Sequence, residues 1–149
     1  MGRETFVFPF ATYYLEGYMK LIDMYNGCKE QYPEAVVFIK SGKFYLTFDN
    51  DAFIISYLLN YKKVNNKVGF PESAKEKVVM ELNNKEINYF FIDEDGKQYD
   101  NNQYYLCLKK ANEDIMVTNI ANSLVKTIKE KITLDFDNYG KIKDFINEL

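Results

Sequence analysis

An aromatic pair directly after a glycine turn is the feature of this sequence best suited to bind a ligand. In SGKFYLTFDND, residues 41–51, the turn residues Gly42 and Lys43 are followed at once by Phe44 and Tyr45. An exposed ring at such a position can stack on a flat partner such as a nucleobase. The ordinary alternative is that both rings belong to a strand that enters a core, which is the usual place of aromatic residues in sheets.

Five lysines lie near this pair in a chain whose overall charge is −3. Between residues 36 and 71 there are five lysines and two aspartates, a local charge of +3. A basic face that contacts phosphates is one interpretation, and a solvated surface is the default one. The lysines are Lys40, Lys43, Lys62, Lys63 and Lys67.

The sequence lacks the residues that most catalytic sites require. The 149-residue chain has no histidine, which removes Ser-His-Asp and Cys-His catalysis and every histidine-based metal site. Cys28 and Cys107 are too few for a structural zinc site. Gly42-Lys43 lacks the upstream glycine and the following hydroxyl of a phosphate-binding loop. We therefore expect no enzyme, no cofactor, no metal and no bound nucleotide.

Composition and termini indicate a cytoplasmic protein without a membrane partner. Hydrophobic residues make up 47% of the chain and charged residues 28%, which is ordinary for a globular protein. No apolar run approaches the roughly 18 residues of a membrane span. The N-terminus, with Arg3, Glu4 and Pro9, is a poor signal peptide. The two cysteines are expected to be separate thiols in a reducing compartment.

The elements that position the aromatic pair follow from periodicity and turn signals. Tyr14, Tyr18, Ile22 and Tyr25 predict a helix over about 12–30. The runs AVVFIK (35–40) and FYLTF (44–48) predict an antiparallel hairpin. A helix to about residue 61 follows, with Asp49 and Asp51 as capping residues, and it is apolar on most of its surface. We expect other parts of the chain to cover it.

The second half of the chain predicts more strands and helices. A polar loop (62–67) precedes the capping box Ser73-Ala74-Lys75-Glu76 and a helix to about 84. INYFFI (87–92) and YYLCL (104–108) predict strands, and helices are expected over 114–131 and after Asp137. This order predicts an α/β (α+β) fold in one domain over 1–149, with a mixed sheet flanked by helices.

The middle of the chain resembles the N-terminal mismatch-recognition domain of the DNA mismatch repair protein MutS. That domain carries a YP…GDFYE.F.DDA…LL segment and, later, a G(I/V)P turn followed by a helix and a strand. The corresponding pieces occur here in the same order and cover about residues 14–93, which leaves 94–149 as an added strand and C-terminal helices. They are Tyr32-Pro33-Glu34, AVVFIKS, Gly42-Lys43-Phe44-Tyr45, Phe48, Asp49-Asn50-Asp51-Ala52, Gly69-Phe70-Pro71 and INYFFI.

The resemblance implies a role for each matching residue. The family's wedge, which stacks on a mispaired base from the minor groove, falls on Phe44, and Tyr45 would support it from behind. The family glutamate that hydrogen-bonds the mispaired base falls on Leu46, which has no polar group. The implied DNA-binding residues are Phe44, Tyr45, Lys43, Lys40, Lys62, Lys63 and Lys67.

Two functions follow as alternatives. The first is a freestanding DNA-binding module for mismatched or distorted duplexes, without ATPase activity, because the family's ATPase region does not fit in this length. The second is a protein-interaction or adaptor module that keeps the fold and has lost DNA recognition. Its partner would be another protein or a second copy of the chain. Mismatch specificity is the property that Leu46 argues against.

Overall fold

The computed structural model describes residues 2–149, with side chains from residue 16 onward. The chain divides into two compact units, residues 1–111 and 112–149, so the expectation of one domain over the whole chain stays a prediction. The helices are α1 (Gly2–Gln31), α2 (Asp49–Leu59), the short η1 (Glu72–Ala74), α3 (Lys75–Asn84), α4 (Tyr104–Leu134) and α5 (Asn138–Asn147). The strands are β1 (Val36–Ser41), β2 (Phe44–Phe48), β3 (Lys67–Pro71), β4 (Tyr89–Phe91) and β5 (Gly96–Lys97).

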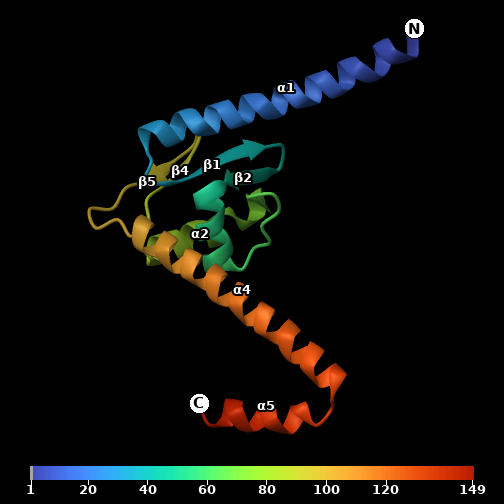
Figure 1. Cartoon of the computed structure of the whole chain (residues 1–149). Helices are drawn as coiled ribbons and strands as arrows, with labels where there is room; N and C mark the ends of the chain where they lie inside the picture. Colours follow the sequence, from blue (N-terminus) through green and yellow to red (C-terminus); the bar gives the residue numbers. More distant parts are fainter. Residues whose placement is uncertain (1) are drawn as a thin grey trace. The chain divides into compact units, whose positions relative to one another are not determined.

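The first unit is built on a mixed five-stranded sheet in the order β3-β2-β1-β4-β5. The central strand β1 pairs antiparallel with β2, with Ser41 opposite Phe44, and parallel with β4, with Val36 opposite Tyr89. The mixed sheet with flanking helices and the β1–β2 hairpin are therefore confirmed. Figure 1 shows α1 on one face of this sheet and α2 on the other.

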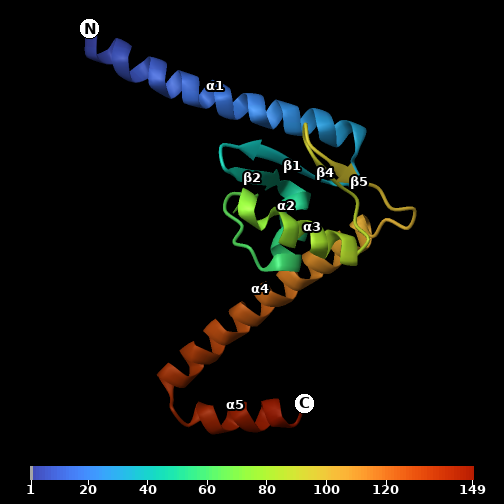
Figure 2. The ribbon, with the colours of Figure 1, turned by 180° about the vertical axis from the view of Figure 1, so that it is seen from behind.

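Strand β1 separates two apolar clusters because its side chains alternate between the faces of the sheet. Val36 and Phe38 face the main core, which α2, α3 and the first turns of α4 complete. Val37 and Ile39 face α1 and pack with the buried Tyr25. Figure 2, which views the unit from behind, shows α3 beside α2 beneath the sheet. The apolar helix α2 is thus covered within its own unit, as its composition predicts.

Two local predictions are wrong. Residues 104–108, predicted as a strand, are the first turn of α4, because Tyr104, Cys107 and Ala111 bury one helical face. The capping box at Ser73 does not form, since η1 precedes α3 and no side chain caps either helix. The polar loop predicted over 62–67 is present over 62–66, and its last residue, Lys67, is bridged to Val64 and begins β3.

The second unit consists of the C-terminal part of α4 and of α5, which begins after Asp137 as predicted. None of its residues is buried. Within the part of the chain that the structure describes, no helix is both long enough and apolar enough to cross a membrane.

Candidate nucleic-acid interface

Phe44 is held at the surface end of β2 by the turn that precedes it. Gly42 has a φ of +62°, a left-handed conformation that glycine adopts without the steric cost of a side chain. The backbone N–H of Glu72 donates to the Lys43 carbonyl oxygen over 2.9 Å and fixes the turn against the residue after β3. The Phe44 side chain, opposite Ser41 and Pro71 in the sheet, is 51% exposed. The ring is therefore available to stack on a partner.

Tyr45 lies on the opposite face of the sheet from Phe44, as strand alternation requires. It is buried, with its ring packed near Phe70 and Phe91. Its hydroxyl donates to Glu94 Oε1 over 2.7 Å. Burial first, and then this hydrogen bond, raises the pKa of Tyr45. Tyr45 therefore fixes β2 against the core. Because it is buried, its effect on a surface site is limited to the position of β2.

Leu46 returns to the face of Phe44 but is packed beneath α1. It borders the cluster of Tyr25, Val37 and Ile39, and its Cδ2 lies 3.0 Å from the position that a Cβ on Gly69 would take. The position where the family has a hydrogen-bonding glutamate is thus part of an apolar contact between sheet and helix. Leu46 has no polar atom to offer a base.

The structure divides the five lysines into two groups at opposite ends of β2. Lys40 and Lys43 flank the hairpin turn beside Phe44. Lys67 pairs with Phe48, four residues along β2 from Phe44, a separation of roughly 13 Å at the rise of a strand. Lys62 and Lys63 precede that end of β3.

Several of these lysines already have partners. Lys40 forms an exposed ion pair of 2.9 Å with Glu72, which raises the pKa of Lys40 through the hydrogen bond and the opposite charge. The Lys63 ammonium lies 3.5 Å from the centroid of the Phe53 ring, and the Lys67 ammonium lies 5.5 Å from that of Tyr18. Lys43 and Lys62 are exposed. Lys40 pairs with Tyr45 in the sheet, so its side chain projects from the face opposite Phe44, and Lys43 is the lysine of this group next to the Phe44 ring.

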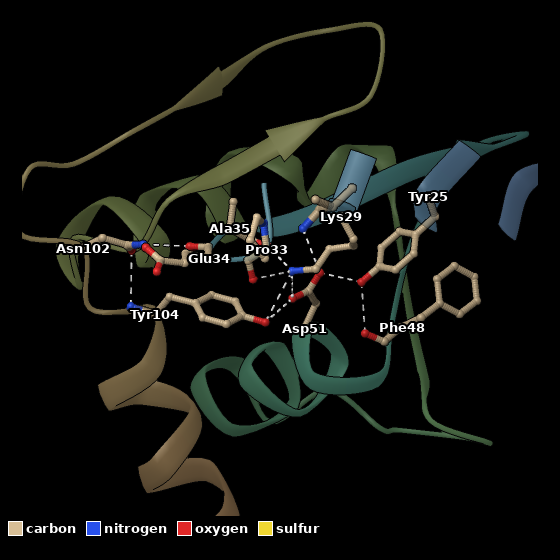
Figure 3. Close-up of polar contacts among 10 residues, drawn as sticks. Tyr25, Lys29, Pro33, Glu34, Ala35, Phe48, Asp51, Asn102 and Tyr104 are labelled. Carbon is tan, nitrogen blue, oxygen red and sulfur yellow. Dashed lines mark hydrogen bonds and ion pairs between the residues drawn. The ribbon is translucent and has the colours of Figure 1, made fainter. Parts of the chain in front are cut away.

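Sequence reasoning missed a buried polar cluster centred on Asp51, which Figure 3 shows. The Asp51 carboxylate accepts from Lys29 Nζ over 3.0 Å and from the Tyr104 hydroxyl over 2.6 Å at one oxygen. Its other oxygen accepts from the Val37 backbone N–H over 3.0 Å and from the Tyr25 hydroxyl. The cluster joins α1, β1, α2 and the start of α4 at one point.

The prediction that Asp49 and Asp51 cap α2 is therefore wrong. Phe48 occupies the N-cap position without a side-chain cap, Asp49 is exposed at a φ of +50°, and Asp51 points into the protein. The spacing along α2 could have indicated that Asp51 is buried. Asp51 precedes the buried Ile54 and Ile55 by three and four residues and therefore shares their face of the helix.

Burial dominates the electrostatics of this cluster. Loss of hydration raises the pKa of the Asp51 carboxyl, and the nearby Lys29 ammonium and the donated hydrogen bonds oppose that rise. Burial and the Asp51 charge both raise the pKa of the Tyr25 and Tyr104 hydroxyls. The Asp51 side chain has no exposed surface, so the cluster stabilises the fold and offers no open site to a ligand.

The cysteines do not contribute a site. Cys28 and Cys107 are both free thiols, which confirms that they are separate. Burial raises the pKa of Cys107 to about 11, so this thiol stays protonated and unreactive near neutral pH. Among the residues that the structure describes, no group of three or more histidine, cysteine, aspartate or glutamate side chains is arranged to hold a metal ion.

Comparison with known proteins agrees with this geometry. The family model described as MutS domain I matches residues 19–98, which include the whole sheet, the Phe44 turn and the members of the Asp51 cluster other than Tyr104. A search of curated proteins found no match to the chain. A match over more than half of the 149 residues, on a mixed sheet with flanking helices, leads to one conclusion: the chain belongs to the MutS domain I family.

Proposed function

We propose that this protein binds duplex DNA at mismatched or distorted sites by inserting Phe44 between bases. The observation that carries the proposal is the half-exposed Phe44 ring, held by a hydrogen-bonded turn at the end of a core strand. Exposed apolar side chains that wedge into a base step kink the duplex where stacking is weakest. Membership of a mismatch-recognition family supports the same use of this ring.

The surroundings of Phe44 suggest weak binding with little base discrimination. Leu46 supplies no hydrogen bond, so preference for a mispair would come from the ease of unstacking it rather than from readout of its edges. Lys43 is the lysine beside the ring, and one phosphate contact corresponds to a slope of about −1 in a plot of log K against log salt. Participation of Lys40, Lys62, Lys63 and Lys67 as well would steepen the slope to about −4 or −5.

The test is fluorescence anisotropy of labelled duplexes, fully paired and G·T-mismatched, at low salt. Phe44→Ala is expected to weaken binding by about 5- to 150-fold, the effect of losing one base–aromatic stack. Tyr57→Ala is the matched control, because Tyr57 is another partly exposed aromatic residue, 41% exposed on α2. Absence of binding by the wild-type protein, or equal binding by Phe44→Ala, would refute the proposal.

Loss of DNA recognition with retention of the fold is the second candidate function. The apolar packing of Leu46 and the Lys40–Glu72 ion pair favour it, because both reduce the polar and positive surface that DNA requires. The protein would then act as a protein-interaction module. In either case we propose that it is not an enzyme, since the chain has no histidine and no phosphate-binding loop.

A further inference from the structure

The second unit carries a large apolar surface that its own residues leave exposed. No residue of 112–149 is buried. Monomeric proteins rarely expose contiguous apolar patches of more than a few hundred Å². The exposed large apolar side chains of this unit are Met116, Val117, Ile120, Leu124, Val125, Leu134, Phe136, Tyr139, Phe145, Ile146 and Leu149.

Part of this surface is a continuous stripe on α4. Val117, Ile120 and Leu124 follow one another at helical spacing and are 56–64% exposed, and the half-buried Ile128 continues the line. From Val117 to Ile128 the stripe spans roughly 16 Å of helix. Its spacing is that of a helix that packs against another helix.

Helix α5 does not cover the stripe. It leaves the end of α4 at an angle instead of lying along it (Figure 1). The two helices are joined near the turn, where the Asn138 side-chain amide donates to the Lys131 carbonyl oxygen over 2.9 Å. Beyond that turn, Tyr139, Phe145 and Ile146 of α5 are themselves about half exposed or more.

The stripe is small for an interface. It consists of four aliphatic side chains, Val117, Ile120, Leu124 and the half-buried Ile128, which present less area than the about 800 Å² that each partner gives to a standard protein–protein interface. A helix pair formed through the stripe alone is therefore expected to associate weakly.

Charges at the two ends of the stripe indicate which partner fits. Glu113 precedes the stripe and Lys131 follows it, 18 residues or five helical turns apart, so both lie on the same side of α4 as Val117 and Leu124. Among the described residues, neither side chain forms an ion pair. A partner helix that satisfies both must offer an apolar stripe with a positive group opposite Glu113 and a negative group opposite Lys131.

A second copy of α4, running antiparallel, has these properties. With Ile120 opposite Leu124 of the second copy, Val117 faces Thr127 and Glu113 faces Lys131, and each pairing occurs twice by symmetry. A parallel pair would instead place Glu113 opposite Glu113 and Lys131 opposite Lys131, which is repulsive. We propose that two copies of this chain associate through an antiparallel pairing of residues 113–131 of α4.

The first test is sedimentation velocity of the full chain over a concentration series into the high micromolar range. The wild-type protein is expected to shift from monomer to dimer. Leu124→Glu should raise the dimer dissociation constant at least tenfold, because it places two carboxylates in the apolar contact. Asn122→Glu, on the far side of the same helix turn, is the matched control and should dimerise normally. Both variants should keep the wild-type circular dichroism, since both positions are exposed in the single chain.

The second test is a charge exchange that reports orientation. Glu113→Lys and Lys131→Glu should each weaken the dimer by about 2- to 30-fold at low salt, since each disrupts two exposed ion pairs. The double variant should restore wild-type affinity in an antiparallel dimer, and only there, because in a parallel pair it still opposes like charges. Lys126→Glu, a half-turn away from the stripe, is the control for the change in net charge.

Three outcomes would overturn the proposal. A wild-type protein that stays monomeric throughout the series would show that the stripe does not bind a second copy of the chain. A Leu124→Glu variant that dimerises as well as wild type would place the contact elsewhere. Failure of the double charge exchange to restore affinity would exclude the antiparallel pairing. DNA binding by Phe44 is measured separately, so either proposal can fail without the other.

Discussion

Replacement of Asp51 by asparagine is expected to destabilise the first unit strongly. Asparagine keeps the size of the side chain but has one acceptor oxygen and an amide that donates. The four donors that now converge on the carboxylate, from Lys29, Tyr104, Tyr25 and the Val37 backbone, would then compete for a single acceptor. Lys29 would also lose its buried counter-ion.

The magnitude follows from the burial of the pair. Removing one partner of a buried ion pair costs about 3–5 kcal/mol, since the remaining charge and donors are left unsatisfied. Burial of the charged carboxylate is itself unfavourable, as the raised pKa of Asp51 indicates, and the neutral amide of asparagine avoids this cost. The loss of stability is therefore expected at the lower end of that range. Against a typical total of 5–15 kcal/mol, the loss is a large fraction of the stability. We expect the melting temperature to fall by on the order of 10 °C.

Urea unfolding followed by near-ultraviolet circular dichroism of the tyrosines measures this change in a chain that has no tryptophan. Glu72→Gln is the control, because it removes the acidic partner of an exposed ion pair. The side chains of Lys40 and Glu72 in that pair are 45% and 48% exposed. Such exposed pairs contribute about 0–1 kcal/mol. If Asp51→Asn lowers the free energy of unfolding by no more than Glu72→Gln does, the cluster does not stabilise the first unit. The cost of desolvating the carboxylate would then cancel the hydrogen bonds and the ion pair that it accepts.

The same geometry supports further predictions. Because the folded-state pKa of Tyr25 and of Tyr104 is raised, the contribution of these two hydroxyls to stability should be fully present below about pH 10 and fall above it by up to about 1.4 kcal/mol per pH unit for each tyrosine, as melting between pH 8 and 11 would show. Tyr104→Phe should flatten that fall, and an unchanged slope would contradict the assignment. Gly42→Ala, at a φ of +62° with open space around it, should cost about 1–2 kcal/mol in urea unfolding, and a neutral result would show that the turn relaxes. Gly96→Ala should cost more, because its Cβ would lie 2.4 Å from Phe90 Cδ1 and 2.7 Å from the Tyr89 carbonyl oxygen; a smaller loss than Gly42→Ala would contradict this.

Residues whose roles are local were predictable from the sequence. The hairpin of β1 and β2 follows from two β-branched or aromatic runs separated by a glycine turn, and the structure has it in register. The exposure of Phe44 did not follow from its spacing, because a strand pattern alone favours the core for both aromatics. The resemblance to a family that uses this position as a wedge indicated the surface, and Phe44 is exposed whereas Tyr45 is buried.

Residues whose roles depend on distant partners were not predictable. Tyr104 lies in a five-residue run with strong strand propensity, and only the longer spacing to Cys107 and Ala111 marks a helix. Asp51 has the sequence context of a helix cap, yet its partners are 14 to 53 residues away along the chain. The separation of the lysines into two groups depends on the pairing of β2 with β3, which places Lys67 at the opposite end of β2 from Phe44.

Selection for a stable fold bears differently on the neighbouring residues Phe44 and Tyr45. Loss of the exposed Phe44 ring opens no cavity, whereas truncation of a buried aromatic residue such as Tyr45 typically costs 3–5 kcal/mol. Selection for a stable fold therefore acts much more strongly on Tyr45 than on Phe44. A lineage can lose the ring by a single nucleotide change in its gene and regain it by another, while the protein continues to fold. Persistence of phenylalanine at this position over evolutionary time would accordingly record selection for binding more than selection for stability.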